Sequence, residues 1–251
     1  MHRSCFKRPL PRKLSLCIHS TAGNEQHLEE LIFFLAERGY VFKDPSEFVT
    51  ATDNACLLSF DDNFRSWLRV LPILEKHDAR ATFYVNTWPF RDRVSATDMR
   101  YYLRRVKAEQ ESTLSTSELK EIADAGHLVG AHTHTHPVLT VLPQEAARDE
   151  IRICQEELAS LFNRSPEHFA YPFGMRRHFN RSLRNYCMSI GFKTIANGIP
   201  CMQYADSKVD GLQRSSWFLD QPFAYNLDNV CIDARVFSYI TGRSADGGGF
   251  S

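Results

Sequence analysis

Short apolar runs alternate along the chain with stretches in which apolar residues recur every three or four positions. The runs predict strands at residues 14–19, 55–60, 81–85, 127–131, 168–171 and 192–196. The helical spacing predicts helices at 24–38, 144–162 and 181–190, and the capping box Ser115–Glu118 predicts another that ends near Gly126. Such alternation is typical of an α/β protein with a largely parallel sheet.

Other stretches are less regular. A helix is predicted to carry Phe64, Leu68 and Leu71, with Pro72 bending or breaking it. Residues 91–110 are rich in arginine and tyrosine without a clean period, which indicates an insertion. Asn24 is the expected N-cap of the first helix, and a last helix is expected at 233–240. The glycines at 247–249 follow no strand and precede no helix, so they predict a flexible end rather than a phosphate-binding loop.

The length of 251 residues suits one (β/α) barrel. We expect a single domain at 14–243, a basic flexible tail at 1–13 and a flexible tail at 244–251. Lysine plus arginine equal aspartate plus glutamate, so the net charge gives no attraction to nucleic acid. No apolar run approaches the roughly 18 residues that cross a bilayer, and the start lacks a secretory signal. The basic tail permits at most weak contact with a membrane surface.

The seven cysteines form no C-x-x-C pair. Cys17, Cys56 and Cys231 stand inside apolar runs, where cysteine usually serves as a small buried hydrophobic residue. This pattern predicts reduced thiols in a cytoplasmic protein.

Chemistry concentrates in two short motifs that follow predicted strands. Asp61 and Asp62 end one apolar run, and His132, His134 and His136 alternate after another. Two imidazoles and one carboxylate are the ligands of a catalytic divalent metal ion, which keeps an open position for water. In that arrangement one aspartate binds the metal while its neighbour acts as a base. In a parallel barrel both motifs lie at the carboxyl ends of strands, where active sites form.

Each motif has an ordinary structural alternative. Paired aspartates commonly cap a helix and place charge in its first turn. On a strand the three histidines would share one face, whereas on a helix only His132 and His136 would do so. Pro137 disfavours a helix at His136. We expect a turn that joins His132 and His136 and points His134 elsewhere, and the alternative is a solvated loop.

Three segments together resemble the polysaccharide deacetylase family, also called the NodB homology domain or carbohydrate esterase family 4. The resemblance runs from about residue 14 to 214 and includes Ser59-Phe60-Asp61-Asp62, Gly130-Ala131-His132-Thr133-His134-Thr135-His136-Pro137 and Phe169-Ala170-Tyr171-Pro172-Phe173-Gly174. It implies a distorted, incomplete (β/α) barrel with Asp61 as general base. It also implies Asp62, His132 and His136 as ligands of a divalent metal ion, with zinc as the expected ion.

The first predicted strand and the helix after it resemble the poly-N-acetylglucosamine deacetylase branch. By position His19 takes the role of catalytic acid there, and the alternative is an ordinary histidine at a strand end. The family's late Leu-x-x-His segment has no histidine in this chain at 230–233. Ala170 and Phe173 replace an arginine and a tyrosine of many relatives. The resemblance assigns the oxyanion donor to the backbone N–H of Phe173.

Arg214 resembles the arginine that holds the catalytic carboxylate, with a surface salt bridge as the alternative. Tyr171 and Pro172 are expected to bind substrate. Trp88 and Trp217, with Phe218, are expected to line a sugar-binding groove, because flat aromatic faces pack on sugar C–H surfaces. The alternative is that these aromatic residues belong to the core.

The predicted function is metal-dependent removal of N-acetyl groups from an amino-sugar or polysaccharide substrate. The alternatives are hydrolysis of a non-sugar amide or a formamide, and a carbohydrate-binding relative without turnover. The ligand set also fits non-haem iron oxygenases, but the order of the ligands along this chain differs from theirs.

Overall fold

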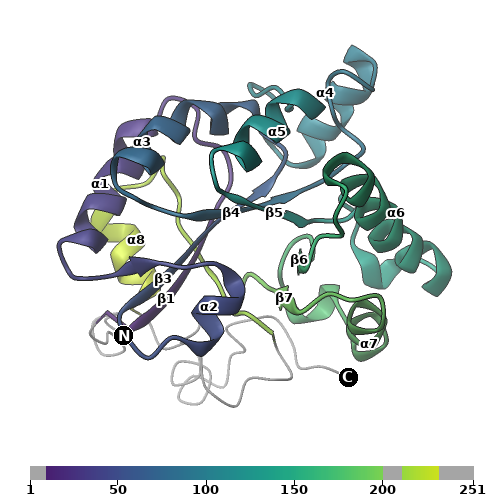
Figure 1. Cartoon of the computed structure of the whole chain (residues 1–251). Helices are drawn as coiled ribbons and strands as arrows, with labels where there is room; N and C mark the ends of the chain where they lie inside the picture. Colours follow the sequence, from purple (N-terminus) through teal and green to yellow (C-terminus); the bar gives the residue numbers. More distant parts are fainter. Residues whose placement is uncertain (1–9, 200–210, 232–251) are drawn as a thin grey trace, which may run out of the picture.

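The computed structural model describes residues 10–199 and 211–231 (Figure 1). The first nine residues, the helix predicted at 233–240 and the predicted tail at 244–251 lie outside the described residues. No described helix combines the length and apolar composition needed to cross a lipid bilayer.

One curled parallel sheet forms the centre of the molecule. Its strands are β1 (Lys13–Ile18), β2 (Val41–Phe42), β3 (Ala55–Asp62), β4 (Ala81–Val85), β5 (Leu128–Ala131), β6 (His168–Ala170), β7 (Thr194–Ala196) and β8 (Ser215–Ser216). The strand order is β7-β6-β5-β4-β3-β1-β8, with β2 paired to β3. A parallel bridge between Ala196 and Leu212 brings the end of β7 to the segment that leads into β8. The predicted fold, a distorted and incomplete (β/α) barrel, is confirmed.

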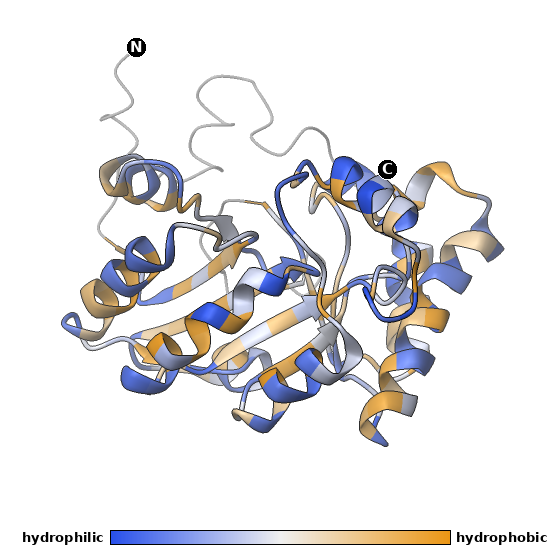
Figure 2. Ribbon diagram, turned by 90° about the horizontal axis from the view of Figure 1, so that it is seen from above, coloured by the Kyte–Doolittle hydropathy of each residue, from blue (hydrophilic) through white to orange (hydrophobic). Residues whose placement is uncertain are grey.

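The described helices are α1 (Glu25–Ala36), α2 (Pro45–Thr50), α3 (Leu71–Lys76), α4 (Ala96–Arg105), α5 (Thr116–Asp124), α6 (Gln144–Phe162), α7 (Arg181–Ser189) and α8 (Phe223–Val230). Most of them lie on the outer side of the curled sheet, whereas α2 packs Phe48 against Leu57 and Tyr84 on the other side (Figure 1). In α1 the buried residues are the four that the spacing predicted, Leu28, Leu31, Ile32 and Leu35. Burying each such side chain contributes roughly 1.5–3 kcal/mol, which fixes the helix on the sheet. Figure 2 shows hydrophobic and hydrophilic residues mixed along the helices, as expected of helices with one buried face.

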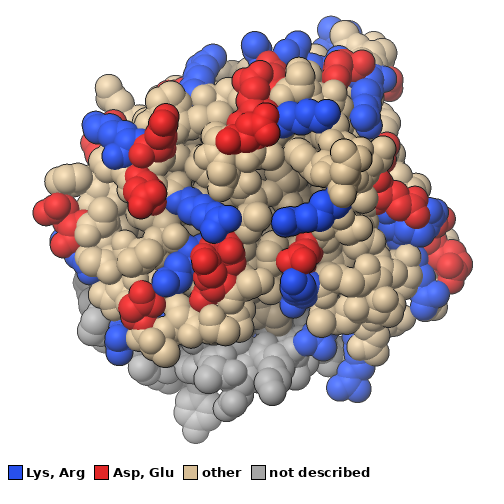
Figure 3. Space-filling view, viewed as in Figure 1, with Lys and Arg blue, Asp and Glu red and all other residues tan. Residues whose placement is uncertain are grey.

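The central strands are buried on both faces. Every residue of β3 and β4 is buried, because helices cover one side of the sheet and packed side chains fill the other. The rings of Phe60 and Phe83 stack with centroids 4.7 Å apart, and Trp67 packs on Phe83. Cys17 and Cys56 are buried free thiols, as predicted. Charges of both signs are interspersed over the face shown in Figure 3.

The helix predicted around Phe64 is divided. Residues Arg65–Val70 form a 3₁₀ helix, and α3 follows it with Pro72 in its first turn. The backbone N–H groups of the first turn have no acceptor within the helix, so a proline there removes no intrahelical hydrogen bond. Pro72 therefore lies at the start of an α-helix and does not bend one. Asn24 does occupy the N-cap position of α1, but its side chain donates to the carbonyl of Ala22 and caps no helical N–H.

The insertion predicted at 91–110 contains a regular helix, α4. Its N-cap is Ser95, whose hydroxyl accepts from the Asp98 N–H at 3.1 Å, and Tyr102 and Leu103 are its buried residues. Met99, Tyr102 and Leu103 stand at helical spacing, but the arginines and the exposed Tyr101 around them obscured that period in the sequence. The short elements β2, α2, β8 and α8 were not predicted either.

Candidate active site

Asp62, His132 and His136 converge at the carboxyl ends of β3 and β5. Their ligand atoms lie within 4.8 Å of one another. Asp62 Oδ1 is 3.1 Å from His136 Nε2 and 3.6 Å from His132 Nε2. All three side chains are buried. The structure thus brings together the three residues expected as metal ligands.

The chemistry of this cluster fits a divalent metal ion. Asp62 Oδ1 is buried without a hydrogen-bond partner, an arrangement that is unfavourable unless another group completes it. His132 Nδ1 lies 2.7 Å from the Ala170 carbonyl, and a carbonyl only accepts. His132 therefore carries its hydrogen on Nδ1 and presents the Nε2 lone pair toward Asp62, as a ligand histidine does.

The protonation states agree with this arrangement. Burial alone would raise the pKa of Asp62, but the nearby His136 and His132 hold it well below its usual range. Burial lowers the pKa of His136 despite the attraction of Asp62. A carboxylate and neutral imidazoles are the forms that bind a divalent cation.

Asp61 faces a different partner, Arg214. The guanidinium donates to both carboxylate oxygens at 2.6 and 2.7 Å, and also to Ser59 Oγ and the Asn197 carbonyl. It lies over the Tyr84 ring, 5.0 Å from the centroid. Burial would raise the pKa of Asp61, but Arg214 holds it below its usual range, so the carboxylate stays ionised. Arg214 is 1% exposed, so the alternative of a surface salt bridge is wrong.

His19 lies beside Asp61 at the end of β1. Its ring nitrogen, an Asp61 oxygen and Cys17 Sγ lie within 4.8 Å of one another, and His19 is exposed whereas Cys17 is buried. Burial raises the pKa of the Cys17 thiol well above its usual value, so the thiol stays protonated. A protonated thiol does not bind a metal ion, so this second cluster offers only one imidazole and one carboxylate, and we assign no metal ion to it. His19 thus meets solvent and also lies close to Asp61.

The loops of the site carry an unusual backbone. Asp62, Thr133, His136 and Phe173 all have φ between 61° and 88°, a region that favours glycine. Each such residue costs about 1–3 kcal/mol, which packing around it must offset. Asp61 and Asp62 are neighbours at the end of β3, so their side chains point to opposite sides, toward Arg214 and toward the histidines.

Phe173 and Gly174 form the loop after β6. The Phe173 ring meets the His136 ring edge-on, with centroids 4.8 Å apart, so this loop borders the metal-ligand cluster. Gly174 has φ 63°, and a Cβ there would collide with the backbone of Gly198. The structure therefore places Phe173 beside the cluster.

A buried network that the sequence analysis did not identify holds the histidine turn. Tyr102 of α4 donates to Asn86 Oδ1 at 2.9 Å, and Asn86 Nδ2 donates to the carbonyls of His132 and Thr133. Asn63 donates to the Asn86 carbonyl at 2.9 Å. Asn86 directly follows the predicted strand 81–85, so its position at the rim was a usable signal. Tyr102 gave none, because its helix was not predicted.

His134 turns away from the cluster, as expected. Its Nδ1 lies 3.0 Å from Thr87 Oγ1 and 3.3 Å from a Glu157 oxygen. Two of the three alternating histidines, His132 and His136, therefore lie in the cluster, whereas His134 connects the turn to Glu157 of α6.

The residues expected to bind substrate differ in exposure. Tyr171 is 2% exposed, donates to the Gly174 carbonyl and stacks on Phe179, so its side chain shapes the loop and is not available to a sugar. Trp217 is 3% exposed and packs edge-on against Phe223, so little of its ring meets solvent. Pro172 is also buried, and Trp88 is half-buried beside the exposed Tyr101.

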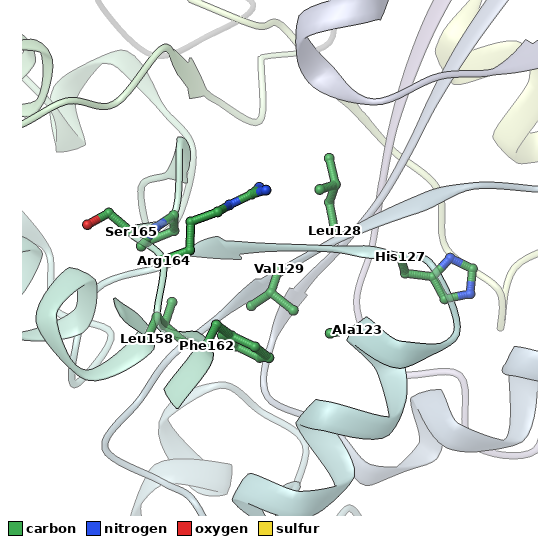
Figure 4. A pocket seen from close by; sticks show the side chains of 9 residues that line it. Ala123, His127, Leu128, Val129, Leu158, Phe162, Arg164 and Ser165 are labelled. Atoms are coloured by element: carbon green, nitrogen blue, oxygen red, sulfur yellow. The ribbon is translucent and has the colours of Figure 1, made fainter. Parts of the chain in front are cut away.

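A pocket elsewhere is unrelated to this cluster. It is lined by His127, Leu128 and Val129 of the β5 start together with residues of α5 and α6 and the loop after α6 (Figure 4). His127 precedes β5 and His132 follows it, so the pocket lies at the opposite end of the strand from the metal-ligand cluster.

Comparison with solved structures shows the same fold. Streptococcus pyogenes deacetylase PplD, solved in complex with acetate, matches with a TM-score of 0.68 at 20% identity, over 90% of this chain and 99% of that one. IcaB from Ammonifex degensii matches with a TM-score of 0.69 at 18% identity, over 87% of this chain and 96% of that one.

Sequence comparison adds curated relatives. A chitooligosaccharide deacetylase of Rhizobium leguminosarum bv. trifolii is 30% identical over 128 residues, which are 50% of this chain and 49% of that protein. A peptidoglycan-N-acetylglucosamine deacetylase of Bacillus cereus is 28% identical over 59% of this chain and 47% of that protein. The chain thus spans about half the length of these relatives. The polysaccharide deacetylase family model matches residues 49–195, more than half of the chain, so the chain belongs to the polysaccharide deacetylase family.

Proposed function

We propose that this protein is a metal-dependent hydrolase that removes N-acetyl groups from amino-sugar units of an oligosaccharide or polysaccharide. One observation carries the proposal: the buried Asp62–His132–His136 cluster stands beside an ionised Asp61 held by Arg214. The names of the curated relatives, which refer to chitooligosaccharide and N-acetylglucosamine, support an N-acetylated sugar as substrate.

Asp62, His132 and His136 would hold the metal ion, and zinc suits two imidazoles and one carboxylate. Such an ion supplies Lewis acidity and lowers the pKa of water from 15.7 to about 7. Asp61 would take the proton of the attacking water. Although Arg214 occupies one lone pair on each oxygen of Asp61, each oxygen keeps another to accept a proton.

An amide also needs a stabilised oxyanion and a protonated leaving amine. The backbone N–H of Phe173 would donate to the oxyanion, supported by the left-handed conformation of Phe173 and its contact with His136. His19 would give a proton to the leaving nitrogen, supported by its exposure and by its place beside Asp61. The two proton carriers then act on opposite partners of the reaction, one on water and one on nitrogen.

The test pairs metal analysis of the purified protein with a screen for acetate release. N-acetylglucosamine oligomers should release acetate, and removal of metal by a chelator should stop the release until zinc is restored. Formate release from formamides without acetate release would favour the alternative amide hydrolase. Oligomer binding without any release would favour a carbohydrate-binding relative, and either result would overturn the proposal.

A further inference from the structure

A second pocket opens between α1 and the segment that joins β8 to α8. It has a volume of about 290 Å³. His27 and Glu30 of α1 line one side, and Trp217, residues 219–223 and Asn226 line the other. Small-molecule sites range over about 300–1,000 Å³, so this pocket suits one sugar unit instead of a chain.

His27 and the two carboxylates of this pocket accept hydrogen bonds, whereas the side-chain amide of Gln221 can also donate. His27 Nδ1 lies 2.8 Å from the Leu219 carbonyl, so it carries the hydrogen and leaves Nε2 as an acceptor. The amide of Asn226 is engaged by the backbone of Phe218 at 2.7 and 2.8 Å. The carboxylates of Glu30 and Asp220 are exposed at the rim, and no lysine or arginine is among the described lining residues. The pocket therefore favours a ligand that donates hydrogen bonds and carries positive charge.

The remaining wall is apolar and firmly packed. Phe223 is held edge-on between Trp217 and Phe34, with ring centroids 5.1 and 4.9 Å away. Leu219 and Pro222 complete the wall. Aromatic and aliphatic surface of this kind packs against the C–H faces of a sugar ring, and an aromatic face also attracts a cation.

The pocket belongs to the same rim as the catalytic cluster. The Trp217 N–H donates to the Cys17 carbonyl at 2.9 Å, two residues before His19. Both β1 and β8 therefore deliver their following loops to one edge of the sheet, with His19 on one loop and the pocket on the other.

We propose that this pocket binds a glucosamine unit, already deacetylated, of the same chain whose N-acetyl group lies at the catalytic cluster. This proposal rests on the proposed function. A glucosamine ammonium offers three donors and a positive charge to Glu30 and Asp220, whereas an N-acetyl group replaces them with a neutral amide and a methyl group. The pocket thereby favours partly deacetylated substrate over fully acetylated substrate.

The experiment measures binding apart from turnover. Calorimetry of the full chain compares glucosamine trimer with cellotriose, which has hydroxyls in place of the amines and contains no acetyl group. The double substitution Glu30→Gln with Asp220→Asn should weaken trimer binding about 3- to 10-fold and leave cellotriose binding unchanged. The control Glu37→Gln removes an exposed charge at the C-terminal end of the same helix. It should change neither the affinity for glucosamine trimer nor the affinity for cellotriose.

Kinetics then provide the second readout. In the double variant the KM for partly deacetylated oligomers should rise by a similar factor, with the KM for fully acetylated oligomers unchanged. Equal affinity of the wild type for both trimers, or trimer binding unaffected by the double substitution, overturns the inference. If binding depends on Glu30 and Asp220 but no oligomer releases acetate, the pocket stands and the proposed function fails.

Discussion

The guanidinium of Arg214 holds both carboxylate oxygens of Asp61, at 2.6 and 2.7 Å, although the two residues are 153 positions apart. A planar guanidinium fixes the orientation of the carboxylate as well as its charge, which an ammonium does not. Removing either partner would leave the other as an unpaired buried charge, which costs about 3–5 kcal/mol.

Arg214→Lys should therefore lower kcat about 10- to 100-fold, because the charge remains while the fork that orients Asp61 is lost. Acetate release under saturating substrate measures this effect. Arg38→Lys, at an arginine that bonds the Phe34 carbonyl on the surface of α1, is the matched control. A kcat unchanged by Arg214→Lys would show that the orientation of Asp61 does not limit turnover.

Substitutions at the two neighbouring aspartates should differ in their effect on bound metal. Asp62→Ala and His136→Ala should reduce bound metal from about one ion per chain to near none, because each removes one of three protein ligands. Asp61→Asn should abolish acetate release but retain the ion. Metal analysis after gel filtration provides the measurement, and retained stoichiometric metal in both ligand variants would contradict the assignment.

Tyr102→Phe should weaken metal binding about 10-fold without unfolding the protein. The substitution removes one hydroxyl that fixes Asn86, which in turn holds the carbonyls of His132 and Thr133. Partners that orient metal ligands typically change affinity by about 10- to 100-fold. Competition with a metal chelator gives the affinity. Tyr101→Phe is the control, since that tyrosine is its neighbour on α4 and is 62% exposed; equal affinities in the two variants would argue against the network.

Stability should depend on pH through Glu118. Burial would raise its pKa, but Arg91, the Ser115 N–H and Arg65 lower it to about 2. Since the folded-state pKa is depressed, this stabilisation is complete above the unfolded value near 4.3 and disappears as pH falls toward 2. Glu118→Gln should therefore lower the free energy of unfolding by about 1–2 kcal/mol at pH 7.

The difference in the free energy of unfolding between wild type and Glu118→Gln should become smaller as pH falls from 5 to 2. Urea unfolding followed by circular dichroism measures this free energy in both proteins. The other carboxylates contribute equally to both values, so their pH dependence drops out of the difference. Glu37→Gln should show a difference near zero throughout. A gap that stays constant with pH would mean that Glu118 stabilises by packing and not by its charge.

Long, strongly patterned segments were predictable because local sequence determines them. Helix α6 has the bounds that its spacing predicted, and the capping box of Ser115 and Glu118 forms at the start of α5. Short elements gave too few residues for a period to appear. Helix α2 is an instructive case, since Asp44 and Glu47 form a capping box with Pro45 in the first turn, a signal present in the sequence.

The site was predictable only in part. Motifs next to strand ends indicated Asp61, Asp62, His132 and His136, because parallel strands deliver their carboxyl ends to one rim. The partner of His132 Nδ1 is the backbone carbonyl of Ala170. Every residue has such a carbonyl, so the amino-acid type at this position could not predict the contact. The burial of Tyr171 and Trp217 likewise depends on distant packing partners, Phe179 and Phe223, that spacing along the chain cannot show.

Asp61 and Asp62 are neighbours on β3, and successive side chains of a strand point to opposite sides. Asp61 consequently meets Arg214 while Asp62 meets His132 and His136. The backbone of both aspartates belongs to a fully buried strand, whereas both histidines belong to the loop after β5. A shift of that loop would therefore change the distances from the histidines to Asp62 before it changed the pairing of Asp61 with Arg214.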